Sequence, residues 1–236
     1  MENSICVKQT RIKDNFFMGL IYLSAFIAVG LLVGIICYVA FRGVSSISWQ
    51  FLSTIPSTLE GTFGILGNIV NTLYIIVITL IIATPIGIGA AVYLTEYAKP
   101  GKIVSLIEFT TETLAGIPSI VYGLFGSLMF VISLNMGLSL LAGSLTLAIM
   151  VLPTIMRTTQ EALVAVPDSY REGSYGLGAG KIRTIFRIIL PSAVPGIMSG
   201  IVLSMGRIVG ETAALIYTSG TVGKISTSVF EPGSTL

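Results

Sequence analysis

Long apolar runs separated by short polar segments dominate the chain. The five runs cover residues 16–41, 65–95, 103–134, 138–156 and 191–217, and charged side chains are nearly absent from them. A hydrocarbon core of about 30 Å takes roughly 20 helical residues to cross, so each run predicts a membrane-spanning helix. Backbone groups in lipid must hydrogen-bond within their own segment. The predicted fold is therefore all-α, a polytopic transmembrane helical bundle.

Composition supports a lipid environment and argues against several other classes of protein. Of the 236 residues, 53% are apolar and 10% are charged, against about 45–50% and 25% in ordinary soluble domains. The two cysteines, Cys6 and Cys37, lie at different levels of the predicted bundle and are not expected to pair. The chain has no histidine, and no cluster of Cys and carboxylates replaces it. We expect no metal, no cofactor, no catalytic centre and no nucleic acid partner.

Lys and Arg fall mainly on one side of the predicted spans. The N-terminal tail 1–15, the loop after the second run and the segment 157–187 carry ten of the 13 basic residues. The positive-inside rule places these parts in the cytoplasm, with the N-terminus inside and Leu236 outside. The expected organisation is a cytoplasmic tail over 1–15, followed by a transmembrane domain over 16–236.

The segment 157–187 is too long for a simple connector. Its first part is rich in helix formers up to Val166 and breaks at Pro167. Four apolar residues further on share one helical face: Ile182, Ile185, Phe186 and Ile189. Such a face suits a helix at the membrane surface or one leading into the last span. The Gly-rich stretch before Lys181 lacks the first Gly and the Ser or Thr of a phosphate-binding loop, so ATP binding by this chain is not expected.

Part of this segment resembles the signature cytoplasmic loop of ABC importer permeases. The pattern in that family is Glu-Ala-Ala, three residues, Gly, nine residues, Ile, any residue, Leu-Pro. The fixed positions that agree are Glu172, Gly178, Ile188, Leu190 and Pro191. Gly173 and Ser174 replace the two usual alanines, which should loosen the short helix.

The resemblance implies that this loop is a coupling helix, which inserts into a cleft of a separate ATP-hydrolysing subunit. The residues implied in ATPase coupling are Arg171, Glu172, Gly173, Ser174, Tyr175, Gly176, Leu177 and Gly178. Gly178 is expected to end the helix. The resemblance also implies the ABC importer permease (MetI-like) fold.

Three further stretches are similar to phosphate-importer permeases of the PstA type: 91–98, 116–125 and 206–213. The resemblance implies a subunit of a phosphate importer in a bacterial or archaeal cell membrane, surrounded by lipid. The implied partners are a homologous PstC-like permease, a dimer of PstB-like ATP-binding subunits and an external PstS-like phosphate-binding protein. That family has six spans and this chain has five predicted ones, so we expect a C-terminally truncated chain that lacks the sixth.

Arg207 and Glu211 are the two charges of the last predicted span. A charge at the bilayer centre costs about 2.5–3.5 kcal/mol on insertion scales, so the pair needs a reason to be there. On one continuous helix the two side chains would be one turn apart on the same face. One interpretation is a self-neutralising ion pair, and the other is a substrate pathway in which Arg207 meets the anion while Glu211 holds Arg207.

Glu108 and Glu112 open the third span and are better explained as a polar stripe paired with nearby basic groups, because carboxylates repel phosphate. Two other functions stay open for the whole chain. One is a permease for sulfate or molybdate, and the other is a membrane scaffold or regulator that transports nothing. An intramembrane enzyme is disfavoured by the missing histidine.

Overall fold

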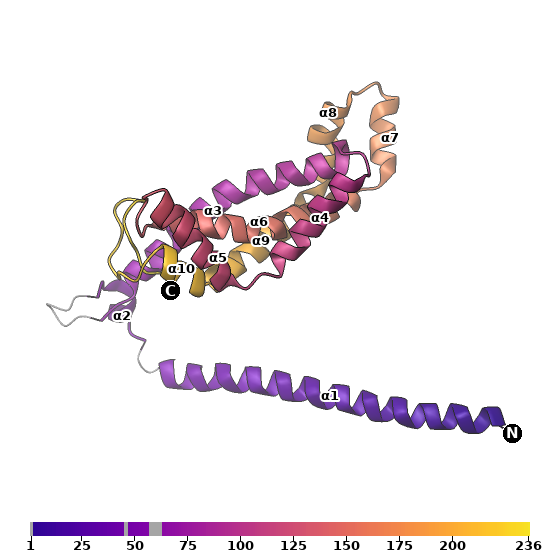
Figure 1. Cartoon of the computed structure of the whole chain (residues 1–236), viewed down its shortest axis with the longest axis horizontal. Coiled ribbons are helices and arrows are strands. Elements are labelled where there is room, and N and C mark those ends of the chain that lie inside the picture. Colours follow the sequence, from indigo (N-terminus) through magenta and orange to yellow (C-terminus); the bar gives the residue numbers. More distant parts are fainter. Residues whose placement is uncertain (1, 45–46, 57–62) are drawn as a thin grey trace. The chain divides into compact units, whose positions relative to one another are not determined.

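The computed structural model describes residues 2–44, 47–56 and 63–236, and every regular element in these ranges is a helix (Figure 1). The chain divides into two units, Met1–Leu52 and Ser53–Leu236. The all-α prediction is therefore confirmed for the part of the chain that the structure describes.

The first unit consists mainly of one long helix, α1 (Glu2–Gly43). Its part Phe16–Gly43 is apolar and long enough to cross a membrane, and none of its apolar window is buried. A helix that is apolar on all sides suits lipid as its solvent. The predicted span 16–41 thus belongs to a longer helix that also takes in the predicted tail. A short helix, α2 (Trp49–Ser53), follows.

The second unit contains all the remaining helices. In chain order they are α3 (Leu66–Val92), α4 (Lys102–Ala115), α5 (Ser119–Gly126), α6 (Leu140–Val164), α7 (Asp168–Gly176), α8 (Lys181–Thr184), α9 (Leu190–Val209) and α10 (Ala213–Thr218). Three π-helical segments extend them: η2 (Tyr93–Tyr97), η3 (Ser127–Ser133) and η4 (Ile185–Ile189). Together with α1, four described helices are long and apolar enough to span a membrane, or five if the bent pair of α4 and α5 counts as one span.

Helix α6 lies at the centre of the second unit, with α3 and α9 packed beside it (Figure 1). One buried apolar cluster includes Ile75, Ala83, Leu147, Val151, Ile155 and Ile208, and the other includes Ala91, Leu94, Met156, Leu163, Ile189 and Ala193. A Cβ on Gly87 would lie only 2.8 Å from Cγ2 of Ile155. Small residues at such crossings let helices approach closely, which favours packing in lipid.

The predicted third span, 103–134, is bent rather than straight. Helices α4 and α5 meet at an angle of 100° across the break at 116–118. Pro118 contributes to this break because it lacks an N–H and restricts the residue before it. The Tyr122 hydroxyl donates a hydrogen bond of 2.8 Å to the Leu114 carbonyl across the bend. The bend is therefore held by a specific contact between the two helices.

The last two predicted spans have different ends in the structure. Helix α6 continues past Met156 to Val164, and Arg157 and Glu161 form an i,i+4 ion pair on the exposed side of this extension. The predicted span 191–217 is divided, because α9 ends at its Val209 and α10 begins three residues after Gly210.

The predicted apolar face before the last span is only half correct. Ile185 and Ile189 are fully buried, whereas Ile182 and Phe186 are 66% and 61% exposed. These residues lie in or beside η4, in which hydrogen bonds join residues five apart instead of four. The wider turn changes which side chains share a face. The piece leads directly into α9, which was one of the two expected arrangements.

Residues 219–236, yellow in Figure 1, are not helical and cover the first turns of α3 and α6. The Leu140 amide donates a hydrogen bond of 3.1 Å to a carbonyl of this segment, which satisfies a donor that the start of α6 leaves open. Asn71 of α3 is fully buried, and its Nδ2 donates to the carbonyls of Lys224 at 3.0 Å and Ser234 at 3.1 Å. The C-terminal segment is thus part of the folded unit.

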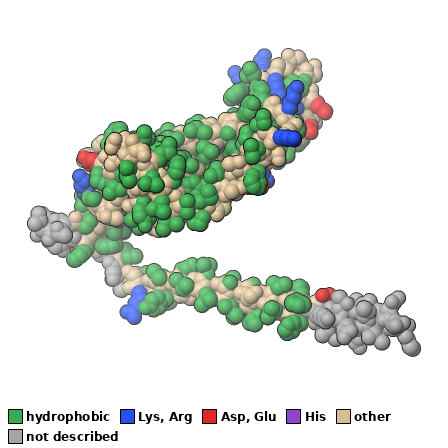
Figure 2. Space-filling model, viewed as in Figure 1, with side chains coloured by type: hydrophobic (Ala, Val, Ile, Leu, Met, Phe, Trp, Pro, Cys, Tyr) green, Lys and Arg blue, Asp and Glu red, His purple; other side chains and the backbone are tan. Residues whose placement is uncertain are grey.

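Charged and apolar side chains are segregated on the second unit. Figure 2 shows Lys and Arg gathered at the end that carries α7 and α8, while apolar side chains cover the middle. This distribution fits a middle zone in lipid and a polar end in the aqueous phase.

Candidate coupling and translocation sites

Helix α7 forms after the predicted break in the chain. Asp168 places a carboxylate in the first turn, where the helix dipole favours negative charge. After the helix, Gly178 has φ +79°, a left-handed conformation that costs glycine little. The Gly178 amide donates to the Tyr175 carbonyl at 2.9 Å, and the Ala179 amide donates to the Ser174 carbonyl at 3.1 Å. This Schellman motif ends α7 at the glycine that the sequence indicates.

Most of the predicted coupling residues point away from the chain. The exposed ones are Glu172, Gly173, Tyr175, Gly176, Leu177 and Gly178. Leu177 is 91% exposed, and Tyr170 and Tyr175 are 50% and 44% exposed. Apolar and aromatic groups on a polar segment are the contacts that a protein partner can bury.

Arg171 is turned inward instead, with a side chain that is 17% exposed. Its Nε and Nη2 donate to Oε1 of Glu96 at 3.2 and 2.8 Å, and its Nη1 donates to Oδ1 of Asp168 at 3.0 Å. Its two remaining N–H groups donate to the carbonyls of Leu163 and Val166, each at 3.0 Å. All five guanidinium donors are therefore used within the chain. Arg171 secures α7 from inside, which differs from its predicted place on the docking surface.

The ion pair between Arg171 and Glu96 joins α7 to the end of α3. The Glu96 side chain is 7% exposed and lies in η2. Hydrogen bonding to Glu96 raises the pKa of Arg171 above its ordinary value, so the guanidinium stays charged. Removing one partner of a buried pair of this kind typically costs about 3–5 kcal/mol.

Two further contacts fix the loop between α7 and α9. The hydroxyls of Ser174 and Thr184 lie 2.8 Å apart in a buried position and join α7 to α8. The Lys181 ammonium lies 4.8 Å from the centre of the Tyr97 ring, a cation–π contact between α8 and η2. Both helices of the loop therefore touch η2.

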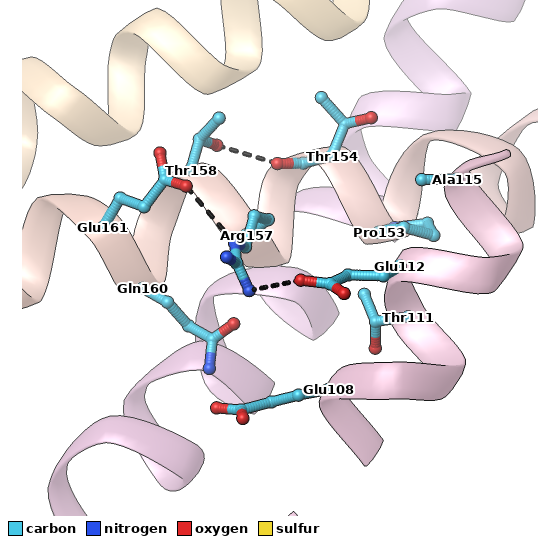
Figure 3. Close-up of a pocket in the computed structure, with 10 residues that line it drawn as sticks. All are labelled: Glu108, Thr111, Glu112, Ala115, Pro153, Thr154, Arg157, Thr158, Gln160 and Glu161. Carbon is cyan, nitrogen blue, oxygen red and sulfur yellow. Dashed lines mark hydrogen bonds and ion pairs between the residues drawn. The ribbon is translucent and has the colours of Figure 1, made fainter. Parts of the chain in front are cut away.

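A cleft of about 260 Å³ lies between α4 and α6 (Figure 3). Arg157 reaches into it, with Nη1 3.2 Å from Oε1 of Glu112 and Nε 3.2 Å from Oε1 of Glu161. Glu108 also lines the cleft. The pairing of Glu112 with a basic group of another span confirms the polar-stripe interpretation for that residue. The three paired side chains are about half exposed or more, so these ion pairs contribute little to stability.

Arg207 lies in the last turn of α9 and is partly buried. The described residues form five ion pairs, and Arg207 belongs to none of them. Among the described residues this guanidinium thus has no carboxylate partner, in contrast to Arg171.

Glu211 does not continue the helix that carries Arg207, which corrects the expected i,i+4 arrangement. Helix α9 ends before it, and Glu211 lies in the break that precedes α10. The side chain is buried, at 8% exposure, and its Oε1 accepts a hydrogen bond of 3.0 Å from the Ala214 amide. Glu211 therefore accepts a hydrogen bond from an open amide in the first turn of α10 and forms no ion pair with Arg207.

Glu96 is not among the site residues that the sequence predicts. A signal was present, because Glu96 is a lone carboxylate that directly follows the charge-free run 65–95. A charge at the end of a span is equally well explained by contact with water. The pairing of Glu96 with Arg171, 75 positions away, is therefore visible only in the structure.

Apolar helices packed around α6, a charged cleft between α4 and α6 and an exposed helix on a polar loop together indicate a polytopic membrane protein. A family model confirms this class. The chain belongs to the family of binding-protein-dependent transport system inner membrane components, whose model matches residues 83–234. The chain is thus a permease subunit of a membrane transporter, as the resemblance in the cytoplasmic loop implies.

Several curated relatives align over most of the chain. The probable ABC transporter permease protein YqgI of Bacillus subtilis is 38% identical over 210 residues, covering 89% of this chain and 71% of that protein. The phosphate transport system permease protein PstA of Mycobacterium leprae is 37% identical over 227 residues, covering 94% and 74%. The phosphate transport system permease protein PstC of Mesorhizobium japonicum is 34% identical over 249 aligned positions, covering 90% and 74%.

A solved structure shares the fold. The inward-facing MetNI methionine ABC transporter matches with a TM-score of 0.58 at 20% identity, covering 68% of this chain and 82% of the other chain. Together with the family model, this likeness confirms the expected MetI-like permease fold.

Proposed function

We propose that this chain is the permease subunit of an ATP-driven importer of inorganic phosphate and forms half of its translocation pathway. The relatives named as phosphate transport permeases support the substrate, since the alignment with PstA of Mycobacterium leprae covers 94% of the chain. The observation that carries the proposal is Arg207, a guanidinium inside the bundle with no carboxylate partner among the described residues.

The chemistry of Arg207 suits a transient phosphate site. A guanidinium presents a planar fork of N–H donors that matches two oxygens of a phosphate group. A single such contact binds an anion without trapping it, as transport requires. Glu211 then acts as a neighbour of the pathway, because its bond to the Ala214 amide fixes the break directly after Arg207.

In this proposal α7 is the docking helix for a separate dimer of ATP-binding subunits. Its exposed residues Glu172, Tyr175 and Leu177 contact the ATPase, while Arg171 holds the helix from inside. ATP-driven closure of the dimer displaces α7 and switches the bundle between inward-open and outward-open states. The remaining partners are a homologous permease and an external phosphate-binding protein, and α7 lies on the cytoplasmic side.

The test is uptake of labelled phosphate by the complete transporter in proteoliposomes. We expect Arg207→Gln to lower uptake by about tenfold or more, because a charge-assisted hydrogen bond is worth roughly 1.5–3 kcal/mol. Arg207→Lys keeps the charge but loses the fork, so its uptake should be intermediate. The matched control is Lys224→Gln, which removes an exposed charge from the C-terminal segment and should leave uptake unchanged.

Unchanged uptake by an Arg207→Gln transporter that assembles normally would remove the proposed role of this residue. Competition with unlabelled sulfate or molybdate separates the oxyanions, since stronger competition by either than by phosphate favours the alternative substrate. ATP hydrolysis without uptake of any of the three anions would favour a scaffold or regulator.

A further inference from the structure

We propose that the Glu96–Arg171 ion pair is a positioning device that fixes α7 to the π-helical end of α3, so that α7 and η2 move as one body. This inference rests on the proposed coupling role of α7. Through this ion pair, a movement of α7 is passed to α3, a helix to which the covalent chain does not directly connect it.

The covalent connections of α7 lead elsewhere in the bundle. Through the chain, α7 is joined to α6 on one side and to α8, η4 and α9 on the other. Helix α3 is 75 residues away in sequence at the point of contact. The two bonds of 3.2 and 2.8 Å from Arg171 to Glu96 therefore connect α7 to a helix with which it shares no chain link.

The geometry of the pair makes this link stiff. The five guanidinium donors hold Glu96, Asp168 and two carbonyls at the end of α6 at the same time, so Arg171 cannot rotate without breaking several bonds. The Glu96 carboxylate is 7% exposed, and water is poorly placed to replace its partner. Asp168, which is 85% exposed, binds the same guanidinium but belongs to α7 itself.

A second contact supports η2 as the receiving element. The Lys181 ammonium lies 4.8 Å from the Tyr97 ring centre, so α8 also contacts η2. The two contacts come from the two helices of the loop and reach neighbouring residues of one π-helical segment. Such segments interrupt regular α-helical bonding and are frequent at functional sites, where a helix end must adjust.

The direct test measures a distance between α7 and η2 in the complete transporter. Spin labels are placed on cysteines at Ser169 and Tyr93, two exposed positions, after both native cysteines have been replaced by serine. We expect the same label distance without nucleotide and with ATP bound. A change of this distance between the two states in the otherwise unaltered permease would show that α7 slides over η2 and would overturn the proposal.

Variants then identify the contact responsible. Glu96→Gln keeps the shape of the side chain but removes its charge, and we expect the distance to shift or broaden when ATP binds. Asp168→Asn removes the other carboxylate of Arg171 without cutting a link between elements, so its distance should match that of the unaltered protein. Equal behaviour of the two variants would contradict the assignment to Glu96.

A functional measurement separates positioning from a merely structural role. We expect Glu96→Gln to keep ATP hydrolysis while phosphate moved per ATP falls by about tenfold, because the ATPase still turns over but moves α3 poorly. Asp168→Asn should keep the normal ratio, and an unchanged ratio in Glu96→Gln would overturn the proposal. If the unaltered transporter moved no phosphate, the proposed function would fail, whereas the label distances would still test the link.

Discussion

The environment of an arginine determines whether it can serve a substrate. The sequence places Arg171 in a polar loop and Arg207 in an apolar span, but it does not show which of the two has acceptors for its N–H donors. The structure gives Arg171 acceptors for all five donors, whereas Arg207 lies in none of the ion pairs formed by the described residues. A guanidinium needs free donors to bind a passing anion, so of the two side chains only Arg207 fits the proposed phosphate site.

Asn71 provides a prediction at the level of a single side chain. Its amide donates to two carbonyls of the C-terminal segment, and its Oδ1 accepts a hydrogen bond of 3.2 Å from the Ser226 amide. Asn71→Ala leaves these groups unpaired in a buried place, at a cost of about 1–3 kcal/mol for each. We expect a lower thermal unfolding temperature and faster protease cleavage within 219–236, both measured on purified protein.

Asn68 is the matched control for this experiment. It is only partly buried, and its side chain makes a single bond of 3.2 Å to the Thr235 carbonyl. Asn68→Ala should therefore cause a clearly smaller change in both measurements. Equal effects of the two variants would mean that the fixed segment does not depend on Asn71.

At the level of helices, local signals predict ends well where no tertiary contact interferes. The end of α7 at Gly178 can be predicted from the sequence, because the left-handed glycine and its neighbours form a motif within six residues. The end of α9 is not predicted, because the break before α10 contains the buried Glu211, whose carboxylate accepts a hydrogen bond from the Ala214 amide. Pro118 predicts that the helix breaks between α4 and α5, but the angle of the bend is set by packing.

Gly173 within α7 and Gly178, two residues after its end, give opposite expectations at this level. Gly178→Ala forces a side chain into a left-handed conformation and should cost roughly 1–2 kcal/mol. Gly173→Ala restores the usual family residue at an exposed helical position with open space around it, and should gain about 0.5–1 kcal/mol. Hydrogen exchange of the amides in α7 measures both, with faster exchange expected for the first variant and slower exchange for the second. The same direction of change in both would contradict this account.

At the level of the whole molecule, the apolar runs predict five spans, a number that the described helices reach if the bent pair of α4 and α5 counts as one, but the runs do not predict how the spans pack in space. Each run of about 20 apolar residues must cross the lipid, which is a local requirement. The central place of α6, the fold-back of residues 219–236 and the contact between α7 and η2 join residues far apart in the sequence. Such contacts depend on packing and on buried polar partners. The sequence pattern of a single segment therefore does not predict them.

The orientation in the membrane is the last expectation to test, and it follows from the basic residues gathered at the end that carries α7 and α8 (Figure 2). Single cysteines at Leu177 and Val222, in a background without other cysteines, report the two ends of the second unit. Leu177 is 91% exposed and Val222 is 43% exposed, so a membrane-impermeant maleimide can reach both in a permease produced without the ATP-binding subunits. In intact cells we expect labelling at Val222 only, and in inverted vesicles at Leu177 only.

Cys6, retained alone in a third variant, should behave like Leu177 if the N-terminus is cytoplasmic. The reverse pattern would place α7 outside the cell, where no ATP-driven subunit could reach it.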